Sequence, residues 1–123
     1  MAPNSVLWFE VVGKDGPALR SFYSKLFGWK IEMGDPGSGF DYGIVGAGNG
    51  GIGGGIGTSP DGSGGFATFY VEVDDVNSAL SKAEKLGGRT IMPAIEIPGM
   101  NITFAYFSDP EGHVIGLSKG MAQ

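Results

Sequence analysis

In each half of the chain, short apolar segments typical of strands flank one longer segment whose apolar residues have helical spacing. In the first half, aromatic and β-branched residues predict strands at 6–12, 29–33 and 40–45. Apolar residues recur at helical spacing from Leu19 to Phe27, which predicts a helix between the first two strands. Asp15 is suited to cap the start of this helix and Gly28 to end it.

The second half repeats this order. Strands are predicted at 67–73, 89–92, 102–107 and 114–118. Apolar residues from Val76 to Leu86 mark one face of a helix that follows the first of these strands. Self-comparison indicates a repeat of about 60 residues, in which the pair Glu10-Val11 matches the pair Glu72-Val73. The chain is therefore expected to be one α+β domain, residues 1–123, with modules at 6–58 and 66–119 joined by a linker at 59–65.

Composition narrows the classes of function. The net charge is −5 and the eight Lys and Arg residues are scattered, so a nucleic-acid partner is not expected. The sequence contains no long apolar run and no signal peptide, so we expect no membrane partner and a cytoplasmic location. Cysteine is absent, which excludes thiolate chemistry. The glycine-rich run 46–57 lacks the Lys-Ser/Thr ending of a phosphate-binding loop, and is expected to allow a kinked strand or close backbone approach.

Several motifs resemble those of the vicinal-oxygen-chelate superfamily, which includes glyoxalases, bleomycin-resistance proteins and extradiol dioxygenases. The resemblance covers most of the chain and is carried by 22–29 (FYSKLFGW), 70–76 (YVEVDDV), 97–100 (IPGM) and 107–117 (FSDPEGHVIGL). It implies two tandem βαβββ modules that form a curled, open mixed sheet, or trough, with helices on the outer face. The superfamily includes enzymes and pure binding proteins, so the fold alone does not imply one activity.

The resemblance also implies where a metal ion would be held. In the family four trough positions carry the ligands, and these transfer to Trp8, Gly54, Thr68 and Gly116. Tryptophan and glycine side chains offer no lone pair to a cation, and threonine is a poor neutral ligand. The single histidine, His113, is expected in a surface turn. No metal or other cofactor is therefore expected, and the alternative is a divalent metal ion.

Strand alternation predicts which side chains share the trough face. Trp8 and Glu10 share one side of their strand, and Thr68, Tyr70 and Glu72 share one side of theirs. Glu10 and Glu72 are candidate catalytic carboxylates. The alternative is that they form ordinary ion pairs or lie at solvent-exposed strand ends. The candidate ligand-binding residues are Trp8, Gly54, Thr68, Tyr70, Met100, Phe104, Tyr106 and Gly116.

Three functions follow from these features. The first is a homodimeric protein that binds a small aromatic or drug-like ligand in a metal-free trough. The second is a glyoxalase-type or lyase-type enzyme that uses a trough glutamate as general base. The third is a non-catalytic interaction module in which the trough is filled by its own side chains. The residues leave open which ligand is bound and whether it is turned over.

Overall fold

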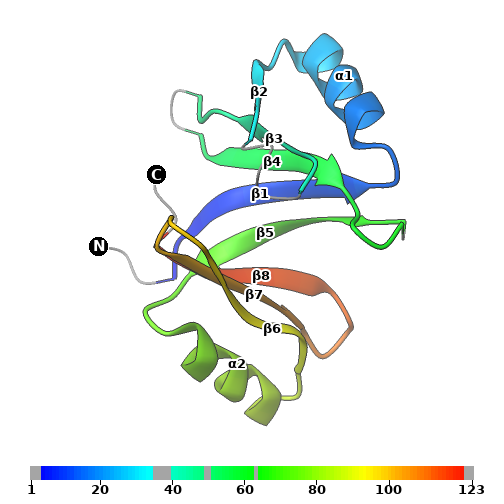
Figure 1. The fold of residues 1–123 in the computed structure, drawn as a ribbon. Helices are drawn as coiled ribbons and strands as arrows, with labels where there is room; N and C mark the ends of the chain where they lie inside the picture. The colour runs from blue at the N-terminus through cyan, green and yellow to red at the C-terminus, as the bar shows by residue number, and fades with distance from the viewer. Residues whose placement is uncertain (1–3, 35–39, 49–50, 63, 121–123) are drawn as a thin grey trace. The chain divides into compact units, whose positions relative to one another are not determined.

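The computed structural model describes residues 4–34, 40–48, 51–62 and 64–120, which form two βαβββ modules (Figure 1). Module one contains β1 (Val6–Gly13), α1 (Gly16–Phe27), β2 (Ile31–Met33), β3 (Tyr42–Val45) and β4 (Gly53–Thr58). Module two contains β5 (Phe66–Glu72), α2 (Val76–Lys85), β6 (Arg89–Ile97), β7 (Ile102–Ser108) and β8 (Val114–Lys119). The predicted α+β class, with its tandem βαβββ modules, is confirmed.

The chain divides into two compact units, 8–67 and 68–123 with 1–7. In the first, the strand order is β2-β3-β4-β1. β1 and β4 run parallel, and the other neighbours are antiparallel. The helix α1 begins where Asp15 accepts a hydrogen bond from the Ala18 amide at 3.0 Å, and ends at Gly28 in the left-handed region, as predicted.

The glycine-rich segment holds a strand that the residue pattern alone does not delimit. In β4, a Cβ atom on Gly54 would lie 2.2 Å from the Phe9 ring, and one on Gly55 would lie 1.9 Å from the Tyr42 ring. Both distances are far below van der Waals contact, so glycine is required for the two aromatic rings to lie against the strand. The expected close approach is therefore made by aromatic side chains of the same module. Residues 49 and 50 of the run lie outside the described residues.

In module two the strand order is β5-β8-β7-β6, with β5 and β8 parallel and the other pairs antiparallel. Asp75 caps α2 by accepting a hydrogen bond from the Ser78 amide at 3.1 Å. The core lies between α2 and one face of this sheet, and contains Val76, Leu80, Ala105 and Leu117. Burying four such side chains stabilises the module by several kcal/mol in all, at about 1.5–3 kcal/mol for each large one.

Each sheet thus has one face toward its own helix and one opposite face, which we call the helix-free face of the module. In module two, Leu117 and Val71 pack with the α2 core, so their strand neighbours Gly116 and Tyr70 point to the helix-free face. In module one, the Phe9 ring lies 5.6 Å from that of Trp29, beside the aromatic residues of α1. Trp8 and Glu10 therefore point to the opposite, helix-free face.

Candidate functional site

Three residues on the helix-free face of module one form a continuous hydrogen-bonded chain. The Trp8 indole N–H donates to the Tyr42 hydroxyl at 2.9 Å, and this hydroxyl donates to the Glu10 carboxylate at 2.8 Å. Glu10 is only 6% exposed. A buried carboxylate is costly without polar partners, so the phenol helps to hold the charge of Glu10 within the module.

Strand alternation predicts the positions of Trp8 and Glu10 but not that of Tyr42. The direction of the Tyr42 side chain depends on the register between β3 and β4, which the sequence pattern does not fix. The structure pairs Tyr42 with Gly57, and its ring extends over Gly55, the residue opposite Glu10. A string of glycines opposite an aromatic residue is the one sequence signal that suggests this packing.

On module two, the helix-free face is built around a pair of tyrosines. The Tyr70 ring covers Gly116, where a Cβ atom would lie 2.5 Å from a ring carbon. The Tyr70 and Tyr106 hydroxyls are hydrogen-bonded to each other. The Phe104 ring meets the Tyr106 ring edge-on at 6.2 Å. The structure thus brings together four of the predicted ligand-binding residues on one face, all within module two.

Two predicted ligand-binding residues lie elsewhere. Gly54 points toward Phe9 on the helix side of module one, whereas Gly55 points to the face of Trp8 and Glu10. Met100 lies in the turn after β6 and is 60% exposed, beside a shallow depression lined by Glu96, Ile97, Pro98, Gly99 and Asn101. The two candidate carboxylates, Glu10 and Glu72, belong to different units and each faces the helix-free side of its own sheet.

The residues at the transferred metal positions do not fit a divalent cation. Trp8 offers only an N–H group, which Tyr42 accepts, and Gly54 and Gly116 have no side-chain donor. The Thr68 hydroxyl donates to the Val114 carbonyl at 2.6 Å. Among the residues that the structure describes, no group of three or more His, Cys, Asp and Glu side chains is placed to hold a metal ion. This donor set does not support metal chemistry.

His113 belongs to a surface turn, as expected. Its ring nitrogen Nδ1 lies 3.0 Å from the Asp109 carboxylate, and the imidazole side chain is 69% exposed. The His113 backbone amide donates to Asp109 at 2.9 Å, and this hydrogen bond is the main reason that the pKa of Asp109 is lowered. The pair thus organises the turn between β7 and β8.

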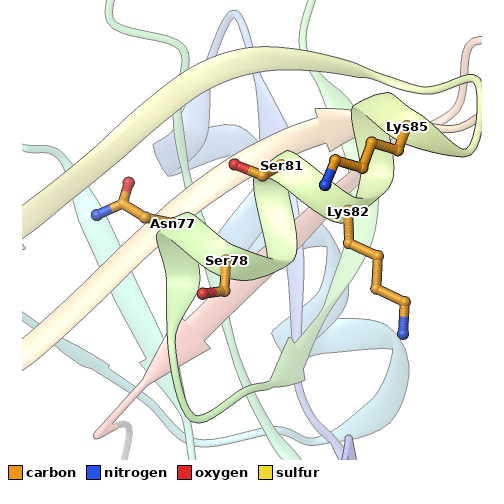
Figure 2. A pocket seen from close by; sticks show the side chains of 5 residues that line it. All are labelled: Asn77, Ser78, Ser81, Lys82 and Lys85. Carbon is orange, nitrogen blue, oxygen red and sulfur yellow. The ribbon is translucent and has the colours of Figure 1, made fainter.

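A polar depression lies on the outer side of α2 (Figure 2). Its lining residues are Asn77, Ser78, Ser81, Lys82 and Lys85, whose side chains spread outward from the helix. All five are exposed, as is typical of the solvated face of an amphipathic helix. Across the described part of the chain, no helix is both long and apolar enough to span a bilayer.

Comparison with known proteins shows the family. Residues 5–117 match the family model described as the Glyoxalase/Bleomycin resistance protein/Dioxygenase superfamily, and the chain belongs to this family. The resemblance stated from the motifs is therefore confirmed.

Two curated relatives and one solved structure illustrate what the chain is similar to. The Mycobacterium tuberculosis protein named "Putative glyoxylase CFP32" is 31% identical over 115 residues, covering 89% of this chain and 43% of that protein. The anthracycline biosynthesis protein DnrV of Streptomyces peucetius is 29% identical over 129 residues, covering 90% and 45%. The chain thus spans less than half the length of these relatives. Methylmalonyl-CoA epimerase from M. tuberculosis shares the fold, with a TM-score of 0.66 at 13% identity, covering 99% and 93%.

Proposed function

We propose that each module of this protein binds a small, planar aromatic molecule on its own helix-free face, without a metal ion. The observation that carries the proposal is the hydrogen-bonded chain from Trp8 through Tyr42 to Glu10. It combines two aromatic rings with a buried carboxylate on one face. Ligand sites are usually built in this way, from aromatic surface and a few fixed polar groups.

The helix-free face of module two has the same character. Tyr70, Tyr106 and Phe104 supply the aromatic surface, and the paired hydroxyls supply polar atoms. The name of DnrV connects that relative with anthracyclines, which are planar polycyclic aromatic compounds. Both observations support a flat aromatic ligand.

An enzyme that uses Glu10 as general base is the second candidate. The observation that favours it is the hydrogen bond from the Tyr42 phenol to the Glu10 carboxylate, because such a pair places a proton donor beside a base. The two functions differ in one measurable respect. Turnover of a bound aldehyde or thioester that is lost in Glu10→Gln would favour the enzyme, whereas binding without product formation favours the binding protein.

The test of the proposed function uses 2,6-dihydroxyanthraquinone and isothermal titration calorimetry. The two tryptophans provide a matched pair, since Trp8 is on the helix-free face and Trp29 is on the helix side with Phe9. Trp8→Leu should weaken binding about tenfold, because an aromatic contact contributes about 0.5–1.5 kcal/mol beyond its area. Trp29→Leu should leave the affinity unchanged, as should dialysis against EDTA.

The proposal fails if the wild-type protein does not bind the anthraquinone. It also fails if the two tryptophan variants weaken binding equally, because the ligand would then show no preference for the helix-free face over the helix side. Loss of binding after EDTA treatment would show that a metal ion takes part.

A further inference from the structure

Ser118 stands out among the buried polar residues of module two. It lies in β8, is 0% exposed, and its hydroxyl has no hydrogen-bond partner in the described part of the chain. It is the only buried side-chain oxygen or nitrogen of the described residues with this property. A buried hydroxyl without a partner costs about 1–3 kcal/mol, and native proteins rarely keep one. An alanine at this position would avoid that cost, so the hydroxyl calls for an explanation.

The register of the sheet places Ser118 on the helix-free face. Its neighbour Leu117 is part of the α2 core, so Ser118 points to the opposite side. It pairs with Glu72 on β5 and with Phe104 on β7, and directly paired residues point to the same side of a sheet. Ser118 is thus two residues from Gly116, which the Tyr70 ring covers.

The neighbouring Glu72 completes a donor and acceptor pair. Its backbone bonds to Ser5 and Asn4, but no hydrogen bond or ion pair of its carboxylate occurs among the described residues. Neighbouring strands of a sheet lie about 4.7–4.9 Å apart, so one ligand atom can reach both side chains. Ser118 can donate a proton to that atom, and Glu72 can accept one from it.

We propose that Ser118 and Glu72 together bind a phenolic hydroxyl group of the aromatic ligand. A phenol accepts from Ser118 and donates to Glu72, so both groups are satisfied. A carbonyl would turn its lone pairs toward the carboxylate, and an aromatic amine, whose lone pair is delocalised into the ring, would accept the serine proton poorly. Phe104 and Tyr106 provide aromatic surface beside the pair. Because Ser118 is enclosed, one of its half-buried neighbours, Phe104 or Glu72, must change rotamer when the ligand binds.

This inference rests on the proposed function, and its test compares 2,6-dihydroxyanthraquinone, whose hydroxyls are not hydrogen-bonded to its own carbonyls, with 2,6-dimethoxyanthraquinone and 2,6-diaminoanthraquinone. The wild-type protein should bind the dihydroxy compound about tenfold more tightly than either analogue. Ser118→Ala and Glu72→Gln should each remove most of this preference. The matched control is Ser81→Ala on the exposed side of α2, which should leave the preference unchanged.

Stability of the unliganded protein gives a second readout that does not depend on any ligand. Ser118→Ala should unfold at the same or a higher urea concentration than the wild type, because the lost hydroxyl has no partner. A clearly lower midpoint would overturn the inference, since the hydroxyl would then have a partner within the protein. Equal binding of all three anthraquinones would overturn it while leaving the proposed function intact. Absence of binding to any of them would refute both.

Discussion

Replacing Gly55 by alanine is the most direct test of how the face of module one is built. A Cβ atom on Gly55 would lie 1.9 Å from Cζ of Tyr42 and 2.0 Å from its hydroxyl oxygen. The ring cannot move away without loss, because its hydroxyl accepts from Trp8 at 2.9 Å and donates to Glu10 at 2.8 Å. The substitution therefore forces a choice between steric overlap and the hydrogen-bonded chain.

Two contributions set the loss of stability expected in Gly55→Ala. Adding a carbon to a well-packed site costs about 1–3 kcal/mol. Breaking the bond to a buried carboxylate adds about 1–3 kcal/mol. We expect Gly55→Ala to lower the free energy of unfolding by about 2–6 kcal/mol, which is a large share of the roughly 5–15 kcal/mol of a typical domain.

Urea unfolding followed by circular dichroism measures this change. Gly46→Ala is the matched control, since a Cβ atom there would meet no heavy atom within 4 Å, and it should change stability little. A double-variant cycle separates the steric part, because Gly55→Ala should cost much less in a Tyr42→Ala background. If Gly55→Ala is as stable as the wild type, the Tyr42 ring does not lie over Gly55, and the hydrogen-bonded chain from Trp8 through Tyr42 to Glu10 is wrong.

Two further predictions concern pH and assembly. Hydrogen bonds from Arg20 and then Thr58 lower the pKa of Asp41, so its stabilisation is full above the unfolded value of about 3.9 and is lost as pH falls through the lower folded value. Acid unfolding should therefore be less pH-dependent in Asp41→Asn, and identical acid profiles would contradict this. We also propose a homodimer, since Phe22 and Leu26 on α1 are each 57% exposed. Sedimentation should show a dimer for the wild type and a monomer for Phe22→Ser/Leu26→Ser, and a wild-type monomer would disprove it.

Most of the fold could be predicted from the sequence because its signals are local. Asp15 and Gly28 bound α1 in the structure as their chemistry predicts. Asp75 likewise begins α2. The strand β4 was not delimited, because consecutive glycines carry no alternation of apolar and polar side chains. The strand β4 depends on the Phe9 and Tyr42 rings that pack against its glycines, and this packing is a property of the tertiary structure.

The candidate site was only partly predictable, for a related reason. Alternation along one strand places Trp8 beside Glu10, but it does not relate one strand to the next. A shift of one residue reverses the face, which is why the sequence pattern predicts Gly54 on the helix-free face where the structure has Gly55. Ser118 gave no signal at all, because a serine in a strand is ordinary until its burial and missing partner are known.

The two modules share one structural feature, a tyrosine ring packed over a strand glycine. In each, a glycine in the strand that runs parallel to the first lies under a tyrosine ring: Gly55 under Tyr42, and Gly116 under Tyr70. A carboxylate introduced at Gly116 would have to displace the Tyr70 ring, whose carbon lies 2.5 Å from the Cβ position. Introducing a metal ligand at Gly116 would therefore require a second change at Tyr70. In both modules, a tyrosine ring and its hydroxyl thus fill the space beside a strand glycine on the helix-free face, where they supply hydrogen bonding and stacking.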